Sequence, residues 1–148
     1  HSMANNLLAQ ACQNKEKDQQ VEPMVFLASG TNDLKIIPMR NLANDAVERR
    51  AQFYALGRQF PDTREAVFIC ETWFVTADRT VDAFKVAPSD HPCRQEAIIL
   101  AGRNRSNTQS VAIVKPFFMI KQDLFWLTSI RSTTPGSAPS PVDLIFAP

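Results

Sequence analysis

Glu71 is the residue in this sequence whose setting could most readily support acid–base chemistry. It lies within VFICETWFVTA, an apolar and β-branched run without glycine or proline that is typical of a strand. Side chains alternate along a strand, so Glu71 shares a face with Ile69 and Trp73, and both faces are apolar enough to be buried. A buried carboxylate either pairs with a cation or has a raised pKa that suits a general acid or base. Pairing with Arg94 or Arg131 from a neighbouring strand is the favoured interpretation.

His91 is the second candidate, in the segment APSDHPCRQEAIILAG. This segment holds a nucleophile (Cys93 or Ser89), a base (His91) and two carboxylates (Asp90 and Glu96). Closeness in sequence does not supply the geometry, because folds normally bring a catalytic cysteine and histidine together from distant positions. Serine and aspartate shortly before a proline are typical of a turn. The sequence also lacks a Gly-x-Ser-x-Gly, a phosphate-binding glycine loop and a His-Glu-x-x-His motif, which weakens the catalytic interpretation.

The third candidate is the basic hairpin AGRNRSNTQS, with Arg103 and Arg105 at its tip and Lys115 in the strand that follows. Arginine among asparagine, serine and threonine can bind phosphates, and nearby aromatic residues could stack on bases. A formal net charge of +1 argues against general binding to nucleic acid, which needs a large basic excess. We therefore favour a solvated hairpin tip over a nucleic-acid interface.

The three cysteines, Cys12, Cys70 and Cys93, cannot all pair within one chain, and their spacing matches no zinc or redox motif. Reduced thiols in the cytoplasm are the simplest interpretation, with neither a metal nor a cofactor expected. The apolar runs are far shorter than the roughly 18–20 residues of a membrane helix, so no membrane association is expected. The first three residues resemble a cloning scar.

Two helices are expected to support these candidates. Residues 4–19 have helix-forming composition, with apolar residues at helical spacing before the segment becomes polar. In residues 42–59, Asp45 precedes Glu48 by three positions, the spacing of a capping box. Gly57 and Pro61 mark the end of that helix. Its expected apolar stripe consists of Val47, Ala51, Tyr54 and Ala55, widened by Phe53, Leu56 and Phe60.

The other apolar runs predict strands. A hairpin is expected on either side of the turn at 30–33, and longer strands at 65–77, 95–102, 108–122 and 124–130. Pro116 cannot donate a ladder hydrogen bond and so marks an edge, a bulge or a bend. The Pro/Ser-rich tail, about residues 132–148, is expected to be irregular until an apolar segment at 142–146, which docks as an edge strand or against the core.

These elements predict one α+β domain over residues 4–148: a mainly antiparallel, twisted sheet of five or six strands packed against one main helix, plus a short N-terminal helix. A central strand with two apolar faces needs cover on both. The second cover is expected to be the N-terminal helix, the tail or another subunit.

Two segments together resemble a group of small uncharacterised bacterial and phage-associated proteins. These are Glu71-Thr72-Trp73-Phe74 and the Pro-Ser-x-x-Pro-x-Arg-x-Glu run from Pro88 to Glu96. The similarity also takes in the capped helix, and the group has no established activity. The resemblance implies one structural cluster in which Arg94 pairs with Glu71 and the loop folds back over the strand. Its members would be Glu71, Trp73, Ser89, Asp90, Arg94 and Glu96.

The leading functional hypothesis is a small cytoplasmic, non-enzymatic protein that binds a partner or self-associates, most simply as a homodimer. The aromatic-rich segment 117–126 and the two-faced strands supply more apolar surface than two short helices readily cover. A hydrolase or transferase that uses Glu71, or His91 with Cys93, is one alternative. Weak nucleic-acid binding through Arg103 and Arg105 is the other.

Overall fold

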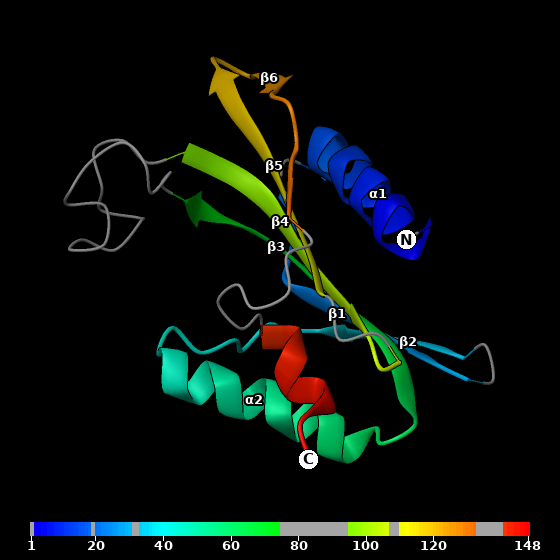
Figure 1. Cartoon of the computed structure of the whole chain (residues 1–148). Coiled ribbons are helices and arrows are strands. Elements are labelled where there is room, and N and C mark those ends of the chain that lie inside the picture. The colour runs from blue at the N-terminus through cyan, green and yellow to red at the C-terminus, as the bar shows by residue number, and fades with distance from the viewer. Residues whose placement is uncertain (1, 19, 31–32, 75–94, 107–109, 133–140) are drawn as a thin grey trace.

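The computed structural model describes residues 2–18, 20–30, 33–74, 95–106, 110–132 and 141–148. As the sequence predicts, the chain has an α+β fold with one antiparallel sheet (Figure 1). The helices are α1 (Ser2–Asp18), α2 (Ala46–Gln59) and the 3₁₀ helix η2 (Pro141–Phe146). The strands are β1 (Met24–Ser29), β2 (Leu34–Pro38), β3 (Thr63–Phe74), β4 (Gln95–Asn104), β5 (Ser110–Ile120), β6 (Asp123–Trp126) and β7 (Ile130–Ser132).

The strand order is β2-β1-β3-β4-β5-β6, and β7 also pairs with β5. The described sheet therefore has seven strands where five or six were expected, because the short β7 adds to the main path. The strand that carries Glu71, β3, is central: it pairs with β1 on one side and with β4 on the other. On the outer edge of β5, β7 pairs with residues 112–114 and β6 with residues 117–120.

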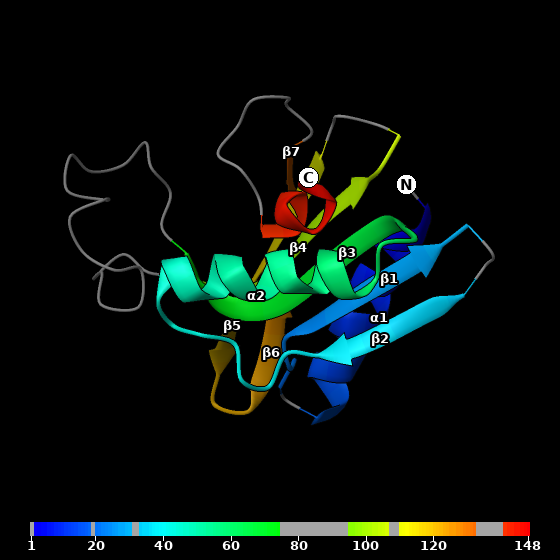
Figure 2. The same ribbon diagram turned by 90° about the horizontal axis from the view of Figure 1, so that it is seen from below.

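One face of the sheet is covered by α2 and η2. Their core contains Phe53 from α2 and Ile145 from η2 packed over Phe68 of β3, and the rings of Phe53 and Phe68 meet edge to face at 5.0 Å. Figure 2 shows α2 lying across β3, with η2 beside it. The apolar segment at 142–146 thus docks against the core as a 3₁₀ helix, one of the two outcomes that the sequence predicts.

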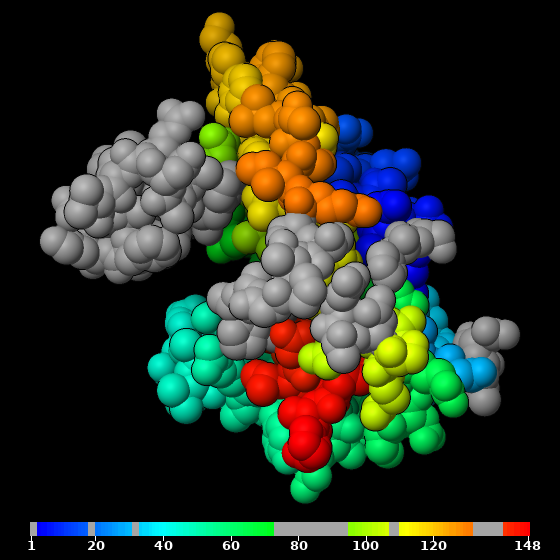
Figure 3. Space-filling model, viewed as in Figure 1, coloured from blue at the N-terminus to red at the C-terminus, as the bar shows by residue number. Residues whose placement is uncertain are grey.

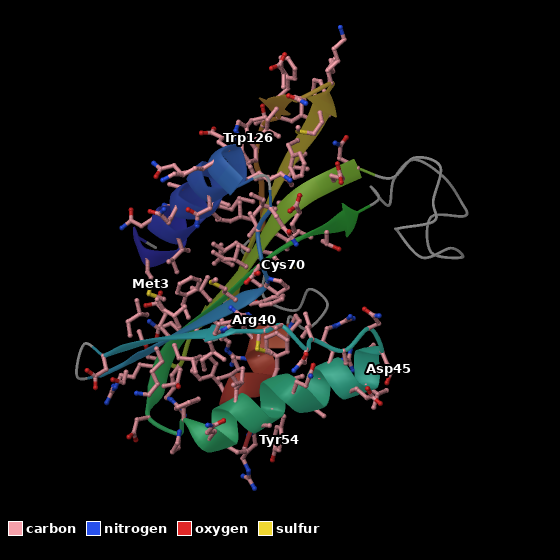
Figure 4. All side chains as sticks on the ribbon, turned by 180° about the vertical axis from the view of Figure 1, so that it is seen from behind. Met3, Arg40, Asp45, Tyr54, Cys70 and Trp126 are labelled. Carbon is pink, nitrogen blue, oxygen red and sulfur yellow. The ribbon has the colours of Figure 1, made fainter. Side chains whose placement is uncertain are left out.

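The opposite face is covered by α1, so the N-terminal helix supplies the second cover that the two-faced strands require. Ala4 and Ala11 of α1 pack with Ile69, Ile98 and Phe117 of the sheet. Trp126 also lies beside this helix (Figure 4), and its indole N–H donates to Glu16 Oε1 at 2.9 Å. None of the helices among the described residues has the length and apolar character needed to cross a membrane.

The predicted cap of the second helix is confirmed, whereas its predicted stripe is confirmed only in the widening residues Phe53, Leu56 and Phe60, which pack in the core. Asp45 is the N-cap, and its carboxylate accepts from the Glu48 backbone N–H at 3.2 Å. The helix buries Phe53 and Leu56, whereas Val47 is 74% exposed and Ala51 and Ala55 also face solvent. The larger side chains bury more apolar area, so they determine which face of the helix meets the sheet.

Gly57 lies inside α2, two residues before its end, where η2 packs most closely. A Cβ atom built on Gly57 would lie 2.0 Å from the carbonyl oxygen of Ile145. The sequence predicts a helix to residue 59 with Gly57 near its end, and α2 does end at Gln59 with Phe60 as its C-cap. The structural role of the glycine is close backbone approach.

Pro116 lies within β5 where the outer partner of that strand changes from β7 to β6. Its carbonyl accepts from the Leu127 N–H at 2.9 Å. The amide and carbonyl of a residue in an antiparallel strand point to the same neighbour, so the missing N–H of Pro116 faces this interrupted edge, as expected for proline in a sheet. The turn from β5 to β6 uses Lys121 at φ 59°.

Candidate functional site

Glu71 is held by two donors from elements that lie before β3 in the sequence. The Lys15 ammonium of α1 donates to Glu71 Oε1 at 2.6 Å, and the Val21 backbone N–H donates to Oε2 at 3.1 Å. Lys15 is only 8% exposed, and its Nζ also lies 4.8 Å from the centre of the Phe117 ring. Both carboxylate oxygens of Glu71 are therefore engaged, which matches the structural interpretation of this residue.

The partner of Glu71 differs from the expected one. Arg131 donates to Asn5 Oδ1, so its predicted pairing with Glu71 is wrong, and Arg94 lies outside the described residues. Lys15 is 56 positions from Glu71, too far for a local motif. A weaker signal is present: Ala4, Ala11 and Lys15 fall at helical spacing, so Lys15 continues the buried stripe of α1.

Burial makes Cys70 a poor nucleophile. It packs against the core beneath α2 and is labelled at the centre of Figure 4. Burial raises the pKa of the Cys70 thiol to about 11 and also raises that of Cys12. A thiolate, not a thiol, is the reactive form, so these two cysteines are chemically quiet near neutral pH. Within the described residues no cluster of three or more His, Cys, Asp and Glu side chains could hold a metal ion.

The predicted cluster around Glu71 can be followed only in part. In the pairing of β3 with β4, Trp73 lies opposite Glu96, and Glu71 lies opposite Ile98. The remaining members of the cluster and of the proposed catalytic pair lie outside the described residues: Ser89, Asp90, His91, Cys93 and Arg94.

Arg103 and Arg105 both make contacts within the chain, with η2 and with the turn before β3. Arg103 pairs with Asp143 of η2 at 3.1 Å. Arg105 donates to the backbone carbonyls of Thr63 and Pro61 at 2.8 and 3.0 Å. Both guanidinium groups also lie over the Phe146 ring, at 5.8 and 5.2 Å from its centre.

The three residues predicted to bind nucleic acid, Arg103, Arg105 and Lys115, do not form one patch. Lys115 lies apart from the two arginines, opposite Ile98 in the pairing of β5 with β4.

The end of the sheet formed by β5, β6 and β7 carries the largest group of exposed apolar side chains on one side of the described sheet. Phe117 is buried against α1, so by alternation Phe118 and Ile120 point to the opposite side. Pairing places Phe125 opposite Phe118 and Ile130 opposite Val114, and Leu127 continues the ladder opposite Pro116. We call this set the β5–β6 patch: Phe118, Ile120, Phe125, Leu127 and Ile130.

The patch residues are between 37% and 55% exposed. The Phe118 and Phe125 rings are stacked, with centres 5.2 Å apart and planes 13° apart. The core of α2 and η2 lies over the other end of this face, around Phe68 and Ala101, and does not extend to the hairpin. In Figure 3 the orange residues of β6 and the segment after it form part of the molecular surface, well away from α2.

Comparisons with known proteins yield no match: no family model matches the chain, and neither a curated protein nor a solved structure is significantly similar.

Proposed function

We propose that this protein works by self-association, with two copies packing their β5–β6 patches against each other around a two-fold axis. The observation that carries the proposal is the exposure of five large apolar side chains on one side of the sheet end formed by β5, β6 and β7. Contiguous exposed apolar surface on a folded domain commonly marks an interaction site. Burying it on association would stabilise the dimer through the hydrophobic effect.

A second copy is the occupant that the chemistry of the patch favours. In a two-fold interface each patch meets itself, so a charged patch would oppose like charges. The five patch residues carry no charge. Of the neighbouring ionisable side chains, Lys121 lies in the turn of the hairpin, and Asp123 lies opposite Ile120 at the edge of the patch. Stacked aromatic pairs such as Phe118 and Phe125 are also the side chains that interfaces use as anchors.

In this proposal the protein is non-enzymatic and acts in a reducing compartment, the cytoplasm. Two features support a non-enzymatic role: Glu71 is engaged by Lys15 and Val21, and burial raises the pKa of the Cys12 and Cys70 thiols, which disfavours their reactive thiolate form.

Variants that place a carboxylate in the patch test the proposal. Ile120→Asp and Phe125→Asp should each convert the protein to a monomer, measured by light scattering after size-exclusion chromatography, with the circular dichroism spectrum unchanged. The matched control is Val47→Asp, because Val47 is an apolar residue of α2 that is 74% exposed and lies outside the patch. Equal masses for wild type and both patch variants would exclude this interface.

A further inference from the structure

A concave site lies at the corner of the sheet where α2 ends. It is a pocket of about 650 Å³ between the turn at 59–63 and the adjoining ends of β1, β2 and β3. Pockets of roughly 300–1,000 Å³ are typical of small-molecule sites. The pocket is distant in sequence from the β5–β6 patch, and nothing in the self-association proposal uses it.

Three cationic side chains from different parts of the sheet line this pocket. Lys35 comes from β2, Arg64 from β3, and Arg105 from the residue after β4. Asp33 and Asp62 line it as well. The excess of one positive charge favours a ligand with a single anionic group over a polyanion.

The three cations have different roles in the structure. Arg105 is used to build the wall, because its guanidinium donates to the carbonyls of Pro61 and Thr63. Across the described chain, neither Lys35 nor Arg64 takes part in an ion pair. These two side chains can therefore offer their charges to a ligand.

Gly30 and Phe60 shape the interior of the pocket. A Cβ atom on Gly30 would lie 2.5 Å from Arg64 Nε, so the missing side chain lets the Arg64 guanidinium lie against the backbone of Gly30, the residue after β1. The Phe60 ring is half-buried, and Lys35 Nζ lies 5.7 Å from its centre. A flat apolar surface thus lies beside two cations.

We propose that this pocket binds a small aromatic anion. Its planar ring packs on Phe60, and its carboxylate or phosphate group lies between Arg64 and Lys35. Guanidinium groups bind both kinds of anion through paired hydrogen bonds, while Phe60 supplies the contact that a bare inorganic anion cannot use.

The experiment is a titration of the ¹⁵N-labelled full chain followed by NMR chemical shifts. The probes are phenyl phosphate, benzoate, inorganic phosphate and the neutral benzyl alcohol. We expect phenyl phosphate or benzoate, or both, to shift the amides around Gly30, Phe60 and Arg64 saturably, and the better of the two identifies the anionic group. Benzyl alcohol and inorganic phosphate should bind at least tenfold more weakly. Equal binding of the neutral alcohol, or no saturable shift at these amides with either aromatic anion, would refute the proposal.

Variants localise the effect. Arg64→Gln should weaken binding of the preferred anion at least tenfold, because it removes the guanidinium group that binds the anionic group. The variant should still fold, because Arg64 is exposed and takes part in no ion pair within the described chain. The matched control is Arg50→Gln, an exposed arginine of α2 that does not line the pocket. Unchanged binding in Arg64→Gln, or equal weakening in both variants, would show that the anion responds to overall charge and not to this site.

Discussion

At the scale of single residues, the Glu71 carboxylate links the sheet to the N-terminal part of the chain. It binds a side chain of α1 and a backbone N–H of the segment that leads into β1. One carboxylate thus fixes both the helix and the start of the first strand. A charge in the centre of an apolar strand is tolerated because its donors arrive with the helix that covers it.

The Lys15–Glu71 pair should behave as a buried ion pair. Lys15→Met should lower the free energy of unfolding by about 2–4 kcal/mol, because it leaves the carboxylate without its cation. The double variant Lys15→Met/Glu71→Leu should be more stable than the sum of the two single changes predicts. Urea denaturation monitored by tryptophan fluorescence measures all three variants.

The exposed pair Arg40–Glu22 is the matched control, since its charged atoms are 3.9 Å apart and its side chains are 76% and 52% exposed. Glu22→Gln should change stability by less than about 1 kcal/mol. If the effects of the Lys15 and Glu71 substitutions on the free energy of unfolding were additive and as small as in this control, the ion pair would not stabilise the fold.

Cys70 gives stability a pH dependence in the alkaline range. Burial raises the pKa of its thiol from 9.0 to about 11, so the folded state binds this proton more tightly than the unfolded state. Its contribution is fully present below about pH 9 and is lost as the pH rises towards 11. Cys70→Ala should therefore show a smaller fall in stability over this interval than wild type. If wild type and Cys70→Ala lost stability equally over this interval, the Cys70 thiol would not be the source of the pH dependence.

At the scale of elements, the C-terminal helix η2 is part of the core. Val142 is fully buried and Ile145 is 2% exposed, and Asp143 anchors the segment to Arg103. The close approach of η2 to α2 depends on Gly57.

Gly57→Ala tests the contact between α2 and η2, because the contact determines whether the substitution raises or lowers stability. Alanine normally stabilises a helix interior relative to glycine by about 1 kcal/mol. Here the added methyl group would collide with the Ile145 backbone, so we expect a loss of about 1–3 kcal/mol in thermal or urea unfolding. The control Ala55→Gly, on the exposed side of the same helix, should cost about 1 kcal/mol as usual. Stabilisation by Gly57→Ala would mean that η2 does not pack at this position.

Elements set by local signals could be predicted from the sequence, whereas contacts between distant elements could not. The Asp45 cap follows from a four-residue pattern, and the second cover of the sheet follows from the two apolar faces of one strand. Lys15 could not be identified as the partner of Glu71, because its burial depends on how α1 docks. The pocket beside Phe60 was missed for the same reason: Lys35, Arg64 and Arg105 come together only through strand order.

At the scale of the whole molecule, the two covers leave one end of the sheet with exposed apolar side chains. The predicted excess of apolar surface around residues 117–126 is found there, and strand alternation divides it: Phe117 and Trp126 pack with α1, while Phe118 and Phe125 face the other side and are exposed. Burying that face in a dimer would complete the second layer of the sheet.

The exposed apolar residues of the edge strand β2 are an alternative to the β5–β6 patch as a dimer interface. Leu34 and Ile36 of the edge strand β2 are 49% and 55% exposed, but β2 also carries Lys35 and ends at Pro38. Lysine and proline on an edge strand oppose pairing with another sheet. Ile36→Asp should therefore leave the oligomeric state of the protein unchanged.

The most direct test of self-association through the β5–β6 patch is sedimentation velocity of the wild-type chain over a concentration series up to tens of micromolar. A dimer held by the β5–β6 patch predicts a sedimentation coefficient that rises with concentration towards that of a compact species of twice the chain mass. In Phe125→Asp the coefficient should stay at the monomer value throughout. A wild-type chain that remains strictly monomeric across the series would contradict the proposed function.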